Sequence, residues 1–308
     1  MSQFRKHNCV TKILSVIIVA YNSDKHIANC IDSIYRHNDL NEKLEIILVD
    51  NSPPENGFCA NLCGKYKEIV FIRNSKNVGF GGANNIGAAY SRGKYLLFLN
   101  PDTIIIEKFF VHIVDEFEDD PFLAICGIKL VSKSLRPQQS FMFRKEYSTL
   151  FSDVFAKILN RLDVFLPTRM ITSGTCMFVR KGTFVKAGMF DPSIFLYGEE
   201  SYLAWAIKAL DSRYRFGYIP WKRIIHLHDF DVIRPHEKYN ILYSQTCFLE
   251  RMGGNPERNL RRLTNYNRVR RVVNLLLGNK GKVADSQYNL DMLASFRKNV
   301  CGRFRSKS

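Results

Sequence analysis

The sequence predicts an α/β protein in which helices cover a mostly parallel β-sheet. Two continuous apolar runs, 14–20 and 44–49, have the β-branched composition of strands that are buried on both faces. Residues 24–37 between them place isoleucines at the spacing of one helix face. The order strand, helix, strand favours a parallel sheet, because the helix returns the chain to the edge where the next strand starts.

This alternation continues along the chain. Apolar runs predict further strands at 69–72, 95–99, 124–131, 172–180 and 215–219. Helical spacing predicts helices at 83–91, 109–117, 181–187, 201–210 and 236–252. Residues 132–168 mix charged, aromatic and polar side chains, and predict no regular element.

Composition limits the class of protein. The chain has 308 residues, of which 46% are apolar, so a packed core is expected. Its net charge of +16 implies an anionic partner, such as a nucleotide, a nucleic acid or an acidic lipid surface. The eight cysteines form no Cys-x-x-Cys pair and fit a reducing cytoplasm. No apolar run reaches the roughly 18 residues that a membrane span needs.

A glycine-rich turn marks the first part of a predicted ligand site. Gly79, Gly81 and Gly82 lack a Cβ atom, so the backbone there can approach a ligand closely. The small-residue helix predicted just after them would turn its positive end towards an anion.

Two carboxylates follow predicted strands. Asp50 ends the second run, and Asp102 lies on the turn Asn100-Pro101-Asp102 after the run 95–99. Ligands of open α/β sheets bind outside the carboxyl ends of the strands. A carboxylate on a rigid turn suits Mg²⁺ or Mn²⁺. Each acid alone also fits ordinary turn chemistry, but two acids at one sheet edge favour a ligand site.

Four runs together, SVIIVAYN, ILVDNS, NVGFGGANNIG and LLFLNPDT, resemble family-2 glycosyltransferases of the GT-A fold. The nearest group is the rhamnosyltransferase-like one of bacterial polysaccharide synthesis, and the resemblance covers about residues 14–228. It implies a Rossmann-like sheet and a hexosyltransferase that acts with inversion. The implied donor is a nucleotide diphosphate sugar, with rhamnose as the best guess for the sugar. The implied acceptor is a hydroxyl of a lipid-linked molecule or a polysaccharide.

The resemblance also implies roles for single residues. Asp50 would contact the nucleobase, and Asn100-Pro101-Asp102 stands at the D-x-D metal motif of the family. Asn100 replaces the first acid there, which leaves Asp102 as the strong ligand for Mg²⁺ or Mn²⁺. The implied donor-binding residues are Ala20, Tyr21, Asn22, Asp50, Asn77, Gly79, Phe80, Gly81, Asn84, Asn85, Asn100, Pro101 and Asp102.

Glu199 and Glu200 begin the predicted helix 201–210. An inverting transfer needs a carboxylate that takes the proton of the acceptor hydroxyl. The resemblance favours Glu200 as this catalytic base, with Glu199 as the alternative. Two acids at a helix N-terminus also fit simple capping, because the helix dipole favours negative charge there.

His226 and His228 stand two residues apart on an extended segment, so both point to one side. Such a pair suits a divalent metal or a diphosphate. The resemblance, in which a histidine closes this site, slightly favours His226.

The predicted domain organisation has four parts. An N-terminal arm, 1–12, precedes a nucleotide-sugar-binding half, 13–103, an acceptor-binding half, 104–230, and a basic helical extension, 231–308. Basic and aliphatic residues alternate in this extension. They fit either a helix on the inner face of the cell membrane or a solvated cap on the catalytic domain. The expected location is therefore cytoplasmic, with or without peripheral contact to the membrane.

Two other classes of protein are weighed against this interpretation. A nucleotidyltransferase that forms nucleotide sugars would carry a glycine-rich basic loop after its first strand, where Tyr21-Asn22-Ser23-Asp24 stands. A nucleic-acid-binding protein would explain the charge, but the basic residues crowd the tail without a recognised motif, so no nucleic acid is expected. The acceptor, the linkage and the oligomeric state stay open.

Overall fold

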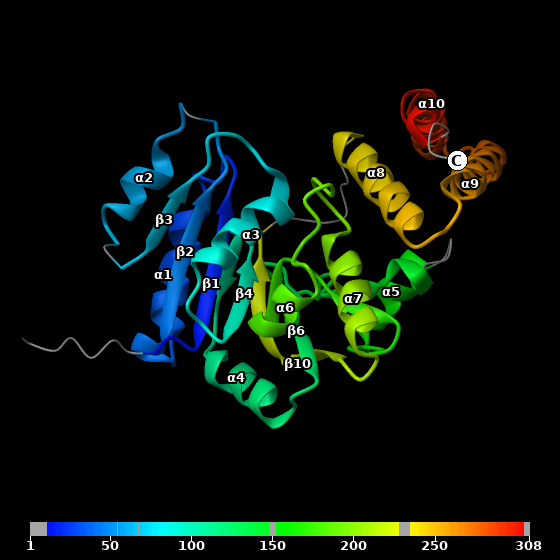
Figure 1. Ribbon diagram of the computed structural model, residues 1–308. Coiled ribbons are helices and arrows are strands. Elements are labelled where there is room, and N and C mark those ends of the chain that lie inside the picture. The colour runs from blue at the N-terminus through cyan, green and yellow to red at the C-terminus, as the bar shows by residue number, and fades with distance from the viewer. Residues whose placement is uncertain (1–10, 54, 67, 148–151, 228–234, 305–308) are drawn as a thin grey trace, which may run out of the picture. The chain divides into compact units, whose positions relative to one another are not determined.

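The structure is a computed structural model that divides into two compact units, Met1–Val232 and Ile233–Ser308 (Figure 1). It describes residues 11–53, 55–66, 68–147, 152–227 and 235–304. The first unit is α/β and the second is helical.

The first unit is built on an eight-stranded sheet with the order β3-β2-β1-β4-β9-β6-β10-β5. Its strands are β1 (Leu14–Ala20), β2 (Leu44–Asp50), β3 (Val70–Arg73), β4 (Tyr95–Leu99), β5 (Thr103–Ile105), β6 (Leu123–Val131), β9 (Cys176–Arg180) and β10 (Arg215–His226). The first four strands in this order run parallel, as do β6 and β10, whereas β9 and β5 are antiparallel to their neighbours. The predicted mostly parallel sheet is confirmed.

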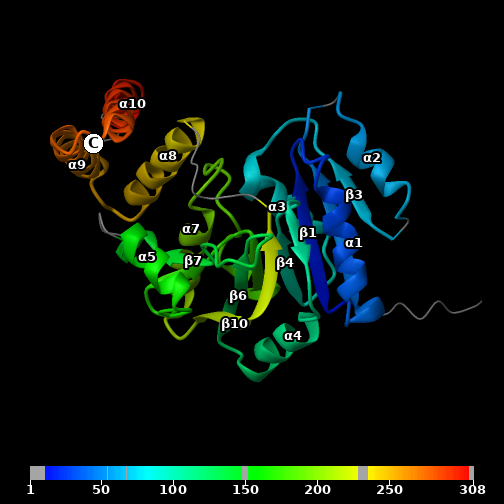
Figure 2. The same ribbon diagram turned by 180° about the vertical axis from the view of Figure 1, so that it is seen from behind.

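Helices cover both faces of this sheet, as Figures 1 and 2 show from opposite sides. One face packs against α1 (Ile27–His37), α2 (Phe58–Cys63) and α4 (Phe110–Asp119). The other packs against α3 (Gly79–Tyr90), α6 (Lys181–Lys186) and α7 (Glu199–Leu210). Alternate residues of β1 enter the two cores, which explains why its run has no polar alternation.

The region 132–168, where the sequence predicted no element, contributes a helix and one strand of a small second sheet. This sheet pairs β7 (Phe141–Phe143) with β8 (Met170–Thr172), and α5 (Ser152–Arg161) contacts it. The amide of Asn160 donates to the carbonyl of Phe141 at 2.9 Å. Short 3-10 helices occur at Asn41–Lys43 and Lys145–Tyr147.

Several element boundaries differ from the prediction. α3 begins at Gly79 instead of near residue 83, so the glycines lie in its first turn. The strand predicted at 172–180 is two strands, β8 and β9, separated by residues 173–175. α2 and β5 had no clear signal in the sequence. β10 continues past Pro220 with a register shift between Ile219 and Arg223.

One buried charge network lies where β1 and β2 begin. Glu45 is 4% exposed. It accepts hydrogen bonds from the Ser15 hydroxyl at 2.6 Å, and from the Arg92 backbone N–H and Nε at 2.6 and 2.8 Å. Burial alone would raise the pKa of Glu45, but these hydrogen bonds outweigh it and leave the pKa lowered. The network joins β1, β2 and the entry to β4.

The second unit contains α8 (Pro235–Arg251), α9 (Pro256–Leu276) and α10 (Lys280–Phe304), which confirms the predicted helical extension. Its small core joins the three helices through Leu242, Leu260, Leu293 and Phe296. The side chain of Asn255 caps α9 by accepting from the Arg258 N–H at 3.0 Å. None of the described helices is both long and apolar enough to cross a membrane.

Candidate active site

The carboxyl ends of β1, β2 and β4 meet at one edge of the sheet. Their parallel register pairs Ala20 with Asp50 and Ile18 with Leu99. Asp50 and the turn that follows β4 therefore lie on this edge together, as the order of strands and acids in the sequence predicted. Ala20 is buried here, whereas Tyr21 beside it is 52% exposed.

Asp50 is fully buried and contacts the protein itself. Its Oδ1 accepts from the Ser52 N–H at 3.0 Å, and its Oδ2 lies 3.5 Å from Nη1 of Arg73, which pairs opposite it on β3. Arg73 in turn donates to the carbonyl of Asn56 at 2.8 Å. Asp50 thus anchors the loop after β2, and its contact with a nucleobase stays a prediction.

Asn51, which the sequence analysis did not single out, joins this strand end to the glycine-rich turn. Its amide donates to Oδ1 of Asn77 at 2.7 Å and to the carbonyl of Gly79 at 3.3 Å. Its Oδ1 accepts from the Asn74 amide at 3.0 Å and the Val78 N–H at 3.2 Å. The sequence signal was present, because Asn51 directly follows an acid that ends a buried strand.

The glycines of this turn allow two protein segments to approach. Gly79 has a φ of +80°, and a Cβ there would lie 2.5 Å from the carbonyl oxygen of Phe195. That oxygen also accepts from the Phe80 N–H at 3.0 Å. A Cβ on Gly81 would lie 3.4 Å from Cγ of Glu199. The first turn of α3 is therefore packed against the segment that leads into α7.

Other predicted donor-binding residues also bond the protein. The amide of Asn84 donates to the Phe80 carbonyl at 3.1 Å. Asn85 forms two hydrogen bonds with the backbone of Phe190, at 2.8 and 3.0 Å. Asn22 has a φ of 49° and donates its N–H to the Ser52 hydroxyl at 3.0 Å. The roles of these residues towards a donor stay predictions.

Asp102 and His226 come together although they are far apart in the sequence. β10 pairs with β5 so that His226 lies opposite Thr103. Nε2 of His226 is then 3.4 Å from Oδ2 of Asp102, and the imidazole is 2% exposed. Sheet pairing thus brings a histidine to the Asn100-Pro101-Asp102 turn. His228 lies outside the described residues.

This pair fits a divalent cation that is completed by substrate oxygens. Within the described part of the chain, no group of three or more His, Cys, Asp or Glu residues could hold a metal ion. Asp102 and His226 would supply two protein donors, and Mg²⁺ is usually bound by one or two carboxylates together with substrate phosphates. Imidazole and carboxylate also suit Mn²⁺.

α7 presents the two candidate bases at its N-terminus. It starts after two residues in left-handed conformation, Tyr197 with φ 70° and Gly198 with φ 105°. Oε1 of Glu200 accepts from the Gly174 N–H at 2.9 Å. The neighbouring Thr175 carbonyl accepts from the Asn100 N–H at 2.9 Å. Glu200 is therefore tied to the same backbone segment that holds the turn of Asp102.

Glu199 has a different environment. It is 1% exposed, and its Oε1 finds no hydrogen-bond partner among the described residues. Burial and then the charge of Glu200 raise the pKa of Glu199 well above its ordinary value of 4.5. Glu200 is the more accessible acid of this pair.

The model of the family described as "Glycosyl transferase family 2" matches residues 15–184, which is more than half of the chain. The chain belongs to glycosyl transferase family 2. The resemblance inferred from the four runs is confirmed. The nucleotidyltransferase and nucleic-acid alternatives find no support in this match.

The chain is similar to several bacterial members. It is 26% identical over 228 residues to rhamnosyltransferase WbbL of Escherichia coli K12, covering 68% of this chain and 82% of that protein. It is 29% identical over 107 residues to minor teichoic acid biosynthesis protein GgaB of Bacillus subtilis 168, covering 34% of this chain. The chain spans 12% of GgaB and 61% of EpsJ, an uncharacterized glycosyltransferase of the same strain.

Two solved structures support the fold. TarS of S. aureus aligns with a TM-score of 0.51 at 19% identity, covering 76% of this chain and 39% of that one. GalNAc-T7, solved with UDP, GalNAc and Mn²⁺, aligns with a TM-score of 0.60 at 14% identity, covering 96% of this chain and 58% of that one. The predicted GT-A fold is confirmed.

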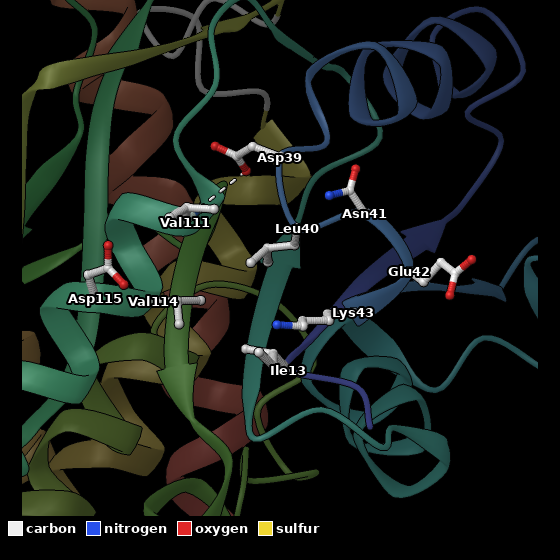
Figure 3. Close-up of a pocket in the computed structure, with 9 residues that line it drawn as sticks. All are labelled: Ile13, Asp39, Leu40, Asn41, Glu42, Lys43, Val111, Val114 and Asp115. Atoms are coloured by element: carbon white, nitrogen blue, oxygen red, sulfur yellow. Dashed lines mark hydrogen bonds between the residues drawn. The ribbon is translucent and has the colours of Figure 1, made fainter. Parts of the chain in front are cut away.

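A surface hollow at the other edge of the sheet is separate from this site (Figure 3). Ile13 and Lys43, which line it, directly precede β1 and β2. At about 3.3 Å per residue, the seven residues of β1 separate it from the carboxyl edge by roughly 20 Å. Oδ1 of Asp39 accepts from the Val111 N–H at 3.2 Å across it. The hollow gathers no set of groups for sugar transfer.

Proposed function

We propose that this protein transfers a sugar from a nucleoside diphosphate donor to an acceptor hydroxyl, with inversion at the anomeric carbon. The proposal rests on the pair of Asp102 and His226, whose Oδ2 and Nε2 atoms are 3.4 Å apart. Residues 174 and 175 join this pair to Glu200, because the Gly174 N–H donates to Glu200 and the Thr175 carbonyl accepts from the Asn100 N–H. A site for a diphosphate and a base for a hydroxyl are the two parts that such a reaction requires.

Glu200 acts as the base. Its carboxylate removes the hydroxyl proton of the acceptor while that oxygen forms a bond to the anomeric carbon. The bond from this carbon to the diphosphate oxygen breaks at the same time, and the diphosphate leaves with the electron pair. The hydrogen bond from the Gly174 N–H fixes one oxygen of Glu200, which leaves the other to face the acceptor.

Asp102 and His226 lie where the leaving diphosphate would be bound. They would bind Mg²⁺ or Mn²⁺, and a bound cation supplies positive charge against the charge that develops on the diphosphate. Asp102 keeps 24% of its side chain exposed, so one side of the pair is open to a ligand.

Rhamnose is the proposed sugar, and a lipid-linked or polysaccharide molecule the proposed acceptor. The likeness to WbbL, named a rhamnosyltransferase, supports the sugar. The likeness to GgaB, named for teichoic acid biosynthesis, supports an acceptor of the bacterial envelope. The proposed location is the cytoplasm, at the inner face of the membrane, because nucleotide sugars and lipid-linked acceptors would meet there.

The test is release of nucleoside diphosphate from dTDP-rhamnose, UDP-hexoses and GDP-mannose, with Mg²⁺ or Mn²⁺ and with envelope glycolipid as acceptor. We expect turnover of one donor, and a loss of at least about a hundredfold in Asp102→Asn, which keeps the size of the side chain but removes its charge. Asp119→Asn is the matched control, because Asp119 is exposed at the end of α4, just before β6 begins, and β6 begins at the end of the sheet opposite to Asp102.

Equal turnover in wild type and Asp102→Asn would remove Asp102 from the site. If no donor turns over, binding of nucleoside diphosphate measured by calorimetry with and without Mn²⁺ decides the case. No binding by the wild type, or binding that Asp102→Asn leaves unchanged, would contradict the proposal.

A further inference from the structure

α9 and α10 form a helical hairpin that, near its turn, exposes aliphatic side chains and buries polar ones in the seam. The two helices run side by side in both views (Figures 1 and 2) and contact each other closely. The side chains buried towards the turn are Asn267, Asn274 and Ser286. The Asn289 amide donates to Oδ1 of Asn267 at 3.2 Å across the seam. The usual pattern of a water-exposed helix pair is reversed here.

The exposed side of α9 carries four aliphatic residues, Val269, Val272, Val273 and Leu276, which we call the aliphatic stripe. Their spacing of three and four residues places them on one helix face. Leu276 is 80% exposed, and the other three are between 47% and 63% exposed. Leu275 and Leu277 beside the stripe are exposed as well. A contiguous exposed apolar surface of this kind marks an interaction site.

The charge around the stripe has one sign. Residues 258–284 contain eight basic residues and no acidic one. Arg268 and Arg271 are exposed within the stripe region, and Lys280 and Lys282 follow the turn. The acids closest along the chain are Glu257, near Arg261, and Asp285, which pairs with Lys238 and Arg270. An anionic surface complements this region, whereas a second copy of the same surface would be repelled.

We propose that the aliphatic stripe binds the surface of an anionic lipid membrane. The stripe would enter the boundary between headgroups and acyl chains, and the arginines and lysines around it would contact lipid phosphates. Lys280 and Lys282 lie in the first turn of α10, beyond the end of the stripe. Charged residues therefore flank the stripe at this end, and the helix would lie along the membrane instead of entering it end-on. The polar seam stays between the two helices, away from the acyl chains.

A second described helix, α5, also exposes apolar residues and serves as a comparison. α5 exposes Val154 and Ile158, which also stand four residues apart. Lys157 and Arg161 lie near them, but the acidic Asp163 does too. α5 therefore lacks the unbroken positive charge that an anionic leaflet requires, and it provides a matched control.

The test is flotation of the full chain with vesicles of phosphatidylcholine, either alone or mixed with phosphatidylglycerol. We expect binding to the mixed vesicles only. Val272→Gln with Leu276→Gln should weaken it at least about tenfold, because two aliphatic side chains lose their apolar burial. Arg268→Gln with Arg271→Gln should weaken it about thirtyfold, from roughly a fivefold loss for each basic residue near an anionic leaflet. Val154→Gln with Ile158→Gln should bind like the wild type.

No binding by the wild type, equal binding to both vesicles, or a loss confined to the α5 pair would overturn the proposal. Light scattering after gel filtration measures the mass of the particle and tests whether the stripe instead binds a second copy of the chain. A self-associated mass that falls in the Val272→Gln, Leu276→Gln variant, without vesicle binding by the wild type, would assign the stripe to a second copy. Nucleoside diphosphate binding by the same variants stays unchanged in every case, so failure here is distinct from failure of the proposed transferase activity.

Discussion

Two buried glutamates at opposite ends of the sheet show that the partners of an acid, and not burial alone, decide the direction of its pKa shift. Glu45 lies where β1 and β2 begin, and Glu199 at the start of α7, near the edge where these strands end. Glu45 accepts three hydrogen bonds, two of them from an arginine. Glu199 has another carboxylate as its neighbour, and its Oε1 finds no hydrogen-bond partner within the described residues.

The two environments move the two pKa values in opposite directions. Hydrogen bonds hold the pKa of Glu45 below its ordinary value in spite of burial, whereas burial and Glu200 hold the pKa of Glu199 well above it. Burial alone therefore does not identify a functional acid. An acid that lacks some of its partners and lies at a sheet edge where ligands bind is a better candidate for a functional role.

The largest expected effect belongs to the acid beside Glu199. Glu200→Gln keeps the hydrogen bond to the Gly174 N–H possible through its amide oxygen but cannot take a proton. We expect the turnover number to fall by roughly 10²- to 10⁴-fold. Binding of nucleoside diphosphate, measured by calorimetry, should stay within about twofold, because the base acts on the acceptor.

Glu42→Gln is the control for this change, because Glu42 is exposed at the other end of the sheet. A fall in turnover of similar size in both variants would argue against a specific role of Glu200. A large loss in Glu199→Gln together with full activity of Glu200→Gln would exchange the roles of the two acids.

The next effect concerns stability. Glu45→Gln removes the charge that binds Arg92, and we expect a loss of about 2 kcal/mol in the free energy of unfolding by urea. Arg92 is more than half exposed, so water compensates part of the loss.

The effect of Glu45→Gln on the free energy of unfolding should depend on pH. A lowered pKa in the folded state adds stability above the unfolded value near 4.5, and this stability is lost as the pH falls through the folded value. The difference between wild type and Glu45→Gln should therefore shrink from pH 7 towards pH 4. A difference that stays constant over this range would mean that packing, and not charge, holds the network.

The smallest effect, with the opposite sign, is expected for Glu199→Gln. A raised folded pKa gives stability that is present below about pH 4.5 and is lost as the pH rises towards the folded value. The neutral amide avoids this loss, so the variant should be more stable than wild type, and the difference should grow from pH 5 to pH 8. Melting curves of both proteins at these two pH values check it. A relative loss of stability on raising the pH would show that Glu199 is ionised and paired.

Sequence patterns located the strands that carry the site. β1, β2 and β4 are continuous apolar runs, so their bounds agree with the prediction to within a residue. The order of their strand ends was enough to place Asp50 and Asp102 on one edge. The family motifs, spread over four runs, then indicated the fold and the class of enzyme.

Contacts between segments that are distant in the sequence could not be predicted from the sequence patterns. Glycines are poor helix formers, so the sequence favoured a start of α3 after them. In the structure the helix begins at Gly79, and the Phe80 N–H in its first turn donates to the carbonyl of Phe195. The approach of His226 to Asp102 depends on the pairing of β10 with β5, a strand of three residues that gives almost no signal. The network of Asn51 likewise joins residues that only the fold brings together.

The bond between the Phe80 N–H and the Phe195 carbonyl also limits how such enzymes can be recombined. Only four residues separate Phe195 from Glu200, so the length of this connector sets the distance between the glycine-rich turn and the proposed base. A chimera that takes its donor half from one protein and its acceptor half from another must keep the number of residues between Phe195 and Glu200. It must also keep a glycine at position 79, where any side chain would collide with the connector.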